Sequence, residues 1–365
     1  MNKKSSHNSK AGAEQAAGEI QTIKLGLDVH ADLIVVVRML DHSTPQPPQR
    51  FTPQKFLAWI PSQLKIARAV HSCYEAGPFG YGLHRQLAEL GVQNLVIQPV
   101  CLDERHKGVN NDQTDALELC QRLDRYVAGN QRALATVRVP TPEEEQRRIH
   151  SRQREQLKRE VKRMAAQGRS LLLSQGFREK GRWWHGPRWA KLSQTLPAWL
   201  VQRLEIFIHL LEAIEEQEIR LRAQIAAAAP KGVPKGMGAF TLQAVEREVG
   251  NWDRFKNRRQ VGSYTGLCGG VSSSGQSTRL LSITKHGNQR LRTLLVELAW
   301  RMKIWQPQCH AVRGWLEPLS QSGSGKASAR KKAIVAVARQ LAVDLWRWRT
   351  GRATAQQLGW IVEGA

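Results

Sequence analysis

The segment 23–40, IKLGLDVHADLIVVVRML, constrains the fold more than any other part of the chain. It contains two runs rich in β-branched and aliphatic residues separated by a short polar stretch, which is the pattern of two strands joined as a hairpin. Residues 67–76 and 92–98 have the composition of two further strands, and residues 79–91 between them have that of a helix. Because strands alternate with helices, the sequence predicts an α/β unit whose sheet is partly parallel.

Four carboxylates fall at the ends of these predicted elements. They are Asp28 and Glu75 at strand ends, and Asp112 and Asp115 in the first turn of a helix predicted over 111–127. Strand carboxyl ends and helix N-termini meet at one edge of such a sheet, so the four can converge there. Carboxylates that close repel one another unless divalent cations neutralise them, and oxygen ligands suit Mg²⁺ or Mn²⁺. We therefore expect a metal site for phosphodiester chemistry; the alternative is that each acid is a helix cap or a surface charge.

The charge of the chain points to a polyanionic partner. Lys and Arg number 55 against 31 Asp and Glu, a formal net charge of +24. Each cation placed on a phosphate releases counterions and adds salt-sensitive affinity, so this excess favours nucleic acid over nonspecific binding to anionic lipid.

The five cysteines include no C-x-x-C pair, which argues against a disulfide framework or a structural zinc site and favours a reducing cytoplasm.

The sequence carries no signal for a membrane. Its first 20 residues lack an apolar core of signal-peptide length, and no later segment has about 18 uninterrupted apolar residues. We expect a soluble cytoplasmic protein with no membrane partner, in which residues 1–22 form a disordered arm.

The middle of the chain is predicted to be helical. Residues 142–178 and 197–228 are rich in charge and have apolar positions at helical spacing, which predicts a long antiparallel helical pair or coiled coil. Between them, Trp183, Trp184 and Trp189 lie among Arg and Lys. These rings either stack on unpaired bases or form the local core of a helix-hairpin tip, and the sequence favours neither.

The last third is predicted to be mainly helical, with a serine-rich segment inside it. Ser272, Ser273 and Ser274 precede Gly275, so a hydroxyl is expected on an exposed turn. A serine that attacks a phosphodiester needs the developing negative charge balanced, and the cations that follow can do this. The simpler alternative is a Ser/Gly loop beside a DNA-binding helix with no chemistry.

The basic residues after this turn are predicted to contact nucleic acid. Asn288 is expected to cap a helix whose N-terminus binds phosphate. The predicted contacts in this segment are Arg279, Lys285, Asn288, Arg290 and Arg292.

Taken together, these segments resemble the IS110 family of insertion-sequence transposases from about residue 24 to residue 349. In that family an N-terminal domain with the RuvC-like ribonuclease H fold carries D…E…D-x-x-D, matched here by GLDVHA, YEAGPFGYGL and NDQTDA. A C-terminal domain carries further motifs, matched in the same order by GMGAFTLQAV, GNWDRF, YTGL, Ser274-Gly275, KHGNQRLR and AVARQL.

The resemblance implies a serine recombinase guided by a noncoding bridge RNA. Ser274 would attack a DNA strand and hold its end covalently, while Mg²⁺ at Asp28, Glu75, Asp112 and Asp115 assists cleavage or exchange. The RNA would pair with donor and target double-stranded DNA, and the subunits would assemble as dimers or tetramers. The family has a proline before its Ser-Gly pair that CGGVSS lacks, so Ser273 stays an alternative nucleophile.

The sequence pattern and the resemblance together predict domain boundaries, and they leave two other functions open. The domains are a RuvC-like domain over 23–140, a coiled-coil insertion over 141–229, a mainly α-helical serine transposase domain over 230–351 and a tail over 352–365. The alternatives are a RuvC-like junction-resolving nuclease that uses only the metal site, and a nucleic-acid-binding remnant without catalysis.

Overall fold

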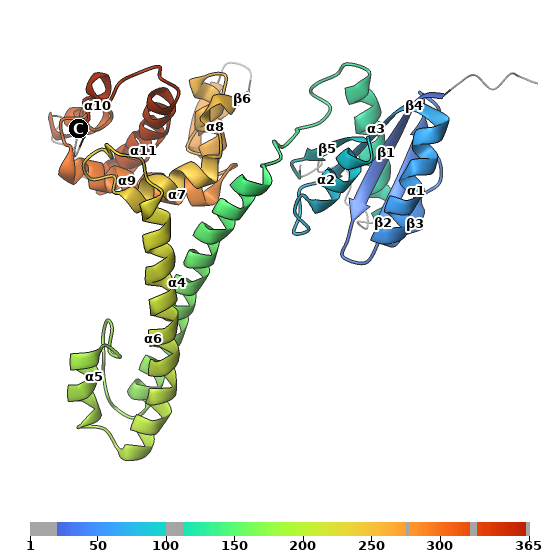
Figure 1. The fold of residues 1–365 in the computed structure, drawn as a ribbon. Helices are drawn as coiled ribbons and strands as arrows, with labels where there is room; N and C mark the ends of the chain where they lie inside the picture. The colour runs from blue at the N-terminus through green and yellow to red at the C-terminus, as the bar shows by residue number, and fades with distance from the viewer. Residues whose placement is uncertain (1–19, 100–111, 275–276, 322–326, 363–365) are drawn as a thin grey trace, which may run out of the picture. The chain divides into compact units, whose positions relative to one another are not determined.

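The computed structural model describes residues 20–99, 112–274, 277–321 and 327–362. The chain divides after Val139 into two compact units (Figure 1). Among the described residues, no helix is both long and apolar enough to cross a bilayer.

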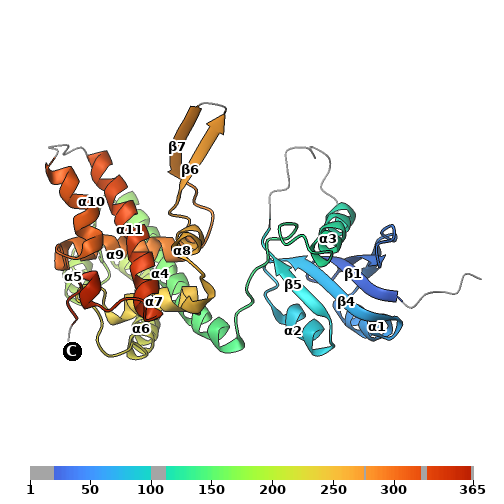
Figure 2. The same cartoon turned by 90° about the horizontal axis from the view of Figure 1, so that it is seen from above.

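The first unit is built on a mixed five-stranded sheet (Figure 2). In spatial order its strands are β3 (Gln49–Phe51), β2 (Ile34–Leu40), β1 (Ile20–Val29), β4 (Ala67–Glu75) and β5 (Gln93–Ile97). β1 pairs antiparallel with β2 and parallel with β4, and β4 pairs parallel with β5. The predicted hairpin and partly parallel sheet are therefore confirmed. Because β1 begins at Ile20, the expected arm over 1–22 is too long, and residues 1–19 lie outside the described part.

Helices cover both faces of this sheet. α1 (Pro53–Ile66) and α2 (Gly82–Glu89) pack on one face over a core that includes Leu25 and Leu27, and α3 (Asp112–Val127) packs on the other. The hydrophobic pattern of the sequence did not indicate α1. Its start has a clear signal, since the Thr52 side chain accepts a hydrogen bond from the backbone of Lys55 at 3.4 Å and a proline follows.

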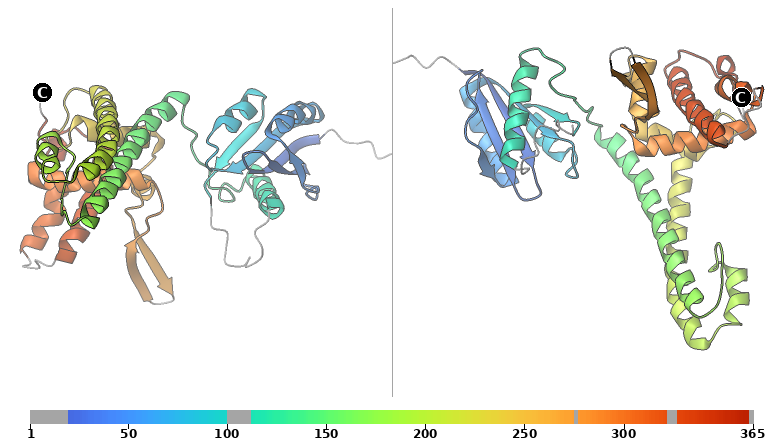
Figure 3. Two further views of the ribbon diagram at one scale, coloured as in Figure 1. Left: turned by 90° about the horizontal axis from the view of Figure 1, so that it is seen from below. Right: turned by 180° about the vertical axis from the view of Figure 1, so that it is seen from behind.

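The second unit begins with a long helical pair. α4 (Pro142–Ser174) starts at a capping box of Thr141 and Glu144, and it packs antiparallel along α6 (Ala198–Ala227) (Figure 3). The short helix α5 (Gly186–Ser193) lies at the tip of the pair. The predicted antiparallel pair is confirmed.

The tryptophans of the tip are core residues. Trp183 is 0% exposed and its indole Nε1 donates to the Ala165 carbonyl at 2.9 Å, while Trp184 is 5% exposed. Their rings pack edge to face, and Trp189 packs partly buried against the same cluster. The prediction that Trp183 and Trp184 contact nucleic acid is therefore wrong for this conformation, because neither ring has a free face for a base.

The rest of the second unit is a helical domain with a two-stranded hairpin. Its elements are α7 (Ala239–Val249), η1 (Trp252–Arg254), α8 (Arg258–Thr265), β6 (Gly269–Ser274), β7 (Ser277–Ile283), α9 (Gln289–Trp305), α10 (His310–Gln321), α11 (Ala327–Arg349) and η2 (Gln356–Leu358). The core lies among α7, α9 and α11, and the β6–β7 hairpin extends away from these helices (Figure 2).

The predicted tail over 352–365 is packed onto this domain as far as residue 362. Trp360 is 5% exposed, and the backbone of Lys235 donates to the Ile361 carbonyl at 2.8 Å. Pro234 and Val362 form a β-bridge. Residues 360–362 therefore pack against the segment around Pro234 and Lys235 that opens the domain.

Candidate functional site

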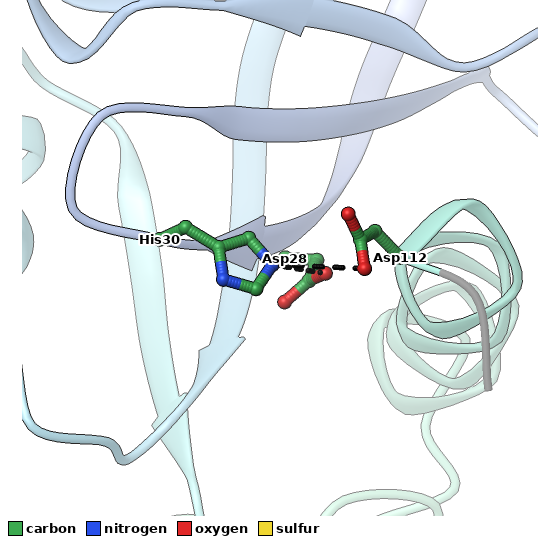
Figure 4. Close-up of side chains that lie close together, drawn as sticks. All are labelled: Asp28, His30 and Asp112. Carbon is green, nitrogen blue, oxygen red and sulfur yellow. Dashed lines mark hydrogen bonds and ion pairs between the residues drawn. The ribbon is translucent and has the colours of Figure 1, made fainter.

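Three potential metal ligands meet at one edge of the sheet in the first unit. Asp28 lies near the end of β1, His30 follows the strand, and Asp112 is the first residue of α3. His30 Nε2 lies 3.1 Å from Asp28 Oδ2 and 3.8 Å from Asp112 Oδ1 (Figure 4). One ligand atom from each of the three residues lies within 4.8 Å of the other two.

The other two predicted acids belong to the same electrostatic cluster. Loss of hydration raises the pKa of Asp28, and the negative charges of Asp112 and Asp115 raise it further, whereas His30 lowers it. Loss of hydration also raises the pKa of Glu75, and Asp115 and Asp28 raise it further. The parallel pairing of β1 with β4 causes this, because it places both strand ends at one edge. The four predicted acids Asp28, Glu75, Asp112 and Asp115, here called the acidic cluster, therefore interact electrostatically, and Asp28 and Asp112 also lie within ligand distance of His30.

The chemistry of the cluster favours a divalent cation. Loss of hydration and, to a lesser extent, repulsion between the acids raise the pKa values of Asp28 and Glu75, and a bound positive ion would offset both effects. The carboxylate oxygens are ligands for Mg²⁺ or Mn²⁺, while the His30 imidazole also suits other transition metals. These residues therefore fit a cation used in phosphodiester chemistry.

His30 is the residue of this site that sequence reasoning missed. Its signal lies in GLDVHA, because residues two apart along an extended strand point to the same side. The bond between His30 and Asp28 follows from that spacing.

A glycine sets how closely β1 and α3 approach. A Cβ placed on Gly26 would lie 2.2 Å from the Ala116 carbonyl oxygen and 2.4 Å from the Cys120 backbone nitrogen. The backbone of α3 therefore lies directly on β1 at this point. An ion pair between the buried Lys24 and the partly exposed Asp124, at 3.0 Å, also joins the two elements. This packing brings the first turn of α3 to the end of β1.

The candidate nucleophiles lie on the hairpin of the second unit. Ser272, Ser273 and Ser274 are exposed, and Ser274 is the last residue of β6, opposite Ser277. The serines therefore lie on a strand rather than on the open turn predicted from sequence, and Gly275 lies outside the described residues. The Ser273 hydroxyl lies 3.3 Å from that of Thr278, whereas the described residues offer the Ser274 hydroxyl no such partner.

Two of the predicted phosphate contacts are exposed, one on the hairpin beside the serines and one at its base. Arg279 pairs across the hairpin with Ser272 and is exposed. Lys285 is exposed at a backbone φ of 58°. Within the described residues neither side chain forms an ion pair with a carboxylate, so both can meet a phosphate.

The other predicted contacts hold the domain together. Arg290 forms a 2.9 Å ion pair with Glu155, and Arg292 donates to the carbonyls of Thr265 and Lys285 at 3.1 Å. Asn288 caps α9 as predicted, accepting from the Leu291 backbone at 3.0 Å. Its amide nitrogen donates to Glu248 Oε2 at 2.8 Å. The structure gives Asn288, Arg290 and Arg292 intramolecular roles, and their contact with nucleic acid stays a prediction.

Comparison with known proteins places these features in a family context. The sequence profile described as "Transposase IS116/IS110/IS902 family" matches residues 234–312, which include the hairpin and α9. The putative transposase y4rJ of Sinorhizobium fredii is 32% identical over 322 residues, covering 80% of this chain and 78% of the relative.

Two other relatives are named for their insertion sequences. The transposase for insertion sequence element IS1328 of Yersinia enterocolitica is 28% identical over 258 residues, covering 67% of this chain and 72% of the relative. The transposase for insertion sequence element IS1111A of Coxiella burnetii is 30% identical over 148 residues, covering 39% of each chain.

Proposed function

The chain belongs to the IS116/IS110/IS902 family of transposases, and we propose that it cleaves and exchanges DNA strands with Ser274 as nucleophile and a divalent cation at the acidic cluster. The observation that carries the metal half of this proposal is the convergence of Asp28, His30 and Asp112 at one sheet edge. The exposed Ser274 hydroxyl at the end of β6 carries the serine half.

The first unit supports a RuvC-like ribonuclease H fold. Its mixed sheet carries Asp28 at the end of β1 and Glu75 at the end of β4, and α3 brings Asp112 and Asp115 to the same edge. When bound there, Mg²⁺ or Mn²⁺ would polarise a phosphoryl oxygen and lower the pKa of bound water. His30 holds the Asp28 carboxylate in place through its 3.1 Å bond.

The serine step transfers one phosphodiester bond. Ser274 Oγ forms a bond to phosphorus and gives its proton to solvent. The bond from phosphorus to one DNA oxygen breaks, and that oxygen takes a proton from solvent and leaves as a hydroxyl. The cation of Arg279, on the adjacent strand, is suited to balance the charge that develops on the phosphoryl oxygens. Because the bond energy is kept in the serine ester, a second DNA hydroxyl can reverse the step and join a new strand.

Target choice is proposed to come from a noncoding RNA. The formal net charge of +24 is suited to holding RNA together with double-stranded DNA. A guide RNA would read the sequence by base pairing, and the protein would hold the backbones. Assembly of the chain as a dimer or tetramer and a cytoplasmic location belong to the same proposal.

A junction-resolving nuclease that uses only the metal is the second candidate. One observation favours it: the acidic cluster is complete within the first unit, without any residue of the hairpin. This candidate predicts strand cleavage with no covalent protein–DNA adduct.

One experiment separates these functions. The full chain is incubated with Mg²⁺, with junction DNA and with the noncoding RNA that flanks its insertion sequence. Covalent protein–DNA adducts are then separated on a denaturing gel. We expect an adduct with the wild type and with the matched control Ser273→Ala, and none with Ser274→Ala. Asp28→Ala should reduce cleavage. Cleavage without any adduct would support the metal-only nuclease, and an adduct lost only in Ser273→Ala would move the nucleophile to Ser273.

A further inference from the structure

The second unit contains a pocket of about 830 Å³ between α8, α11 and the base of the β6–β7 hairpin. Leu267, two residues before β6, and Ile283, the last residue of β7, line it. The pocket therefore lies where the serine-bearing hairpin leaves the helical domain.

The charge of this pocket is strongly positive. Seven of its lining residues are Lys or Arg and none is Asp or Glu. Arg258 and Arg259 begin α8, and Lys332, Arg339 and Arg347 lie along α11. All five are exposed, and within the described residues no carboxylate forms an ion pair with any of them. Such an array of unpaired cations is costly unless an anionic partner neutralises it.

The cations of α11 form a row that matches a nucleic-acid strand. Lys332, Arg339 and Arg347 are seven and eight residues apart, about two turns each, so they lie near one face of the helix. The row spans about 22 Å at a rise of roughly 1.5 Å per residue. One strand of a duplex places a phosphate about every 3.4 Å along its axis, so the row can follow about six phosphates.

Aromatic side chains on the wall favour a nucleotide chain over a simple anion. Trp315 of α10 lines the pocket and is 50% exposed, so its ring is available to a sugar or an unpaired base. Trp346 also lines it, and its buried indole Nε1 has no acceptor in the described part of the chain.

We propose that this pocket binds the phosphodiester backbone of a DNA strand and directs that strand to the hairpin. From Gly269 to Ser274, β6 rises about 17 Å at roughly 3.3 Å per residue. That length corresponds to about five base pairs of duplex. The bound phosphates would therefore lie about five base pairs from the bond that Ser274 attacks. This spacing rests on the proposed function, whereas backbone binding by the pocket does not.

Salt-dependent binding tests the proposal without any cleavage step. The affinity of the full chain for a short labelled DNA duplex is measured by fluorescence anisotropy at several salt concentrations. The variant Arg339→Gln/Arg347→Gln removes two cations of the row. The matched control Lys191→Gln/Arg203→Gln removes two exposed cations of α5 and α6, which do not line the pocket. Thermal unfolding confirms that each variant is folded.

The salt slope is the steepness with which the logarithm of the affinity falls with the logarithm of the salt concentration. We expect this slope to change in the pocket variant alone. Each lost phosphate contact lowers the slope by about 1, so raising salt from 50 to 200 mM should weaken this variant about ten-fold less than the wild type. Trp315→Ala should lower affinity at an unchanged slope. Three results would overturn the proposal. The slope could be unchanged in the pocket variant, it could change equally in the control, or the effect could be seen with duplex RNA but not with DNA.

The same assay separates this proposal from the proposed function. Ser274→Ala should bind DNA like the wild type, because the serine lies outside the pocket. If Ser274→Ala still forms adducts while the pocket variant loses salt-dependent binding, the serine mechanism fails and the pocket stands. If adduct formation depends on Ser274 but the pocket variant binds normally, the pocket proposal fails alone.

Discussion

Gly26→Ala should damage the acidic cluster without touching any of its residues. The new Cβ would lie 2.2 Å from the Ala116 carbonyl oxygen, and Cβ contacts under 3.0 Å are essentially never seen. β1 and α3 must therefore separate by at least about 0.8 Å at this point. The Ala116 carbonyl oxygen and the Cys120 nitrogen, which the new Cβ would meet, both belong to the backbone of α3, so no side-chain rotation relieves the clash.

The separation has two measurable costs. Overpacking of this kind typically destabilises a domain by about 1–3 kcal/mol, which should lower the melting temperature of the first unit. It should also move Asp112 away from Asp28, and metal ligands need placement within about 0.2 Å. A shift of almost 1 Å is expected to weaken metal binding by about 100-fold, by analogy with what such misplacements cost in active sites.

The assay combines thermal unfolding of the full chain with titration of free Mn²⁺, which needs no enzymatic activity. Gly82→Ala is the matched control, because no atom lies within 4 Å of a Cβ built there. It should be neutral or slightly stabilising, since alanine restricts the unfolded chain. A Gly26→Ala protein with wild-type melting temperature and Mn²⁺ affinity would refute the inferred contact between β1 and α3.

Three further predictions concern charge and packing. Because the folded-state pKa of Asp28 is raised, its ionisation destabilises the metal-free fold. Asp28→Asn should therefore raise the melting temperature at pH 7 and lose this advantage below about pH 4. The same variant should abolish stabilisation by Mg²⁺, and a Mg²⁺ effect equal to that of the wild type would contradict this. Burial raises the pKa of Asp344 to about 6, so its stabilising protonated form is lost as pH rises through that value. Asp344→Asn should therefore stabilise the second unit by up to about 3 kcal/mol at pH 8 and progressively less below pH 6, as measured by urea unfolding. Trp183→Ala should destabilise the tip of the α4–α6 pair by about 3–5 kcal/mol while leaving DNA affinity unchanged; a selective loss of DNA affinity would restore a nucleic-acid role for this ring.

The elements that sequence predicted best are those with a strong hydrophobic pattern. The apolar runs of 23–40 fixed the hairpin and placed Asp28 at its strand end, and helical spacing fixed the α4–α6 pair. Local rules were enough there, because burial of one face decides the structure. Asn288 was recognised as a cap for the same reason, since capping depends on residues three apart.

The features that could not be predicted from the sequence depend on contacts between distant segments, or have a residue composition that is typical of loops. α1 contains Pro61, which usually ends a helix, although the Thr52-Pro53 start signals one. β6 consists of glycine and serine residues around Val271 and is largely exposed, so it has no apolar alternation to identify it. Trp183 lies among basic residues in sequence, and only the packing of α4 against α6 shows that it is buried.

The binding pocket could not have been found from sequence. Its cations come from residues 256–259 and 332–352, and α8 must pack on α11 before they share one wall. Arg290 and Arg292 lie in an equally basic segment, yet their guanidinium groups are used within the domain. Charge density along the chain therefore did not distinguish binding cations from structural ones.

The most direct test of serine chemistry is to identify the residue that carries DNA. The covalent product formed by the full chain with its RNA, junction DNA and Mg²⁺ is digested with protease and nuclease, and the modified peptide is sequenced by mass spectrometry. We predict a nucleotide phosphate on Ser274. A phosphate on Ser273 or on a residue outside the β6–β7 hairpin, or cleaved DNA with no modified peptide, would contradict the proposed mechanism.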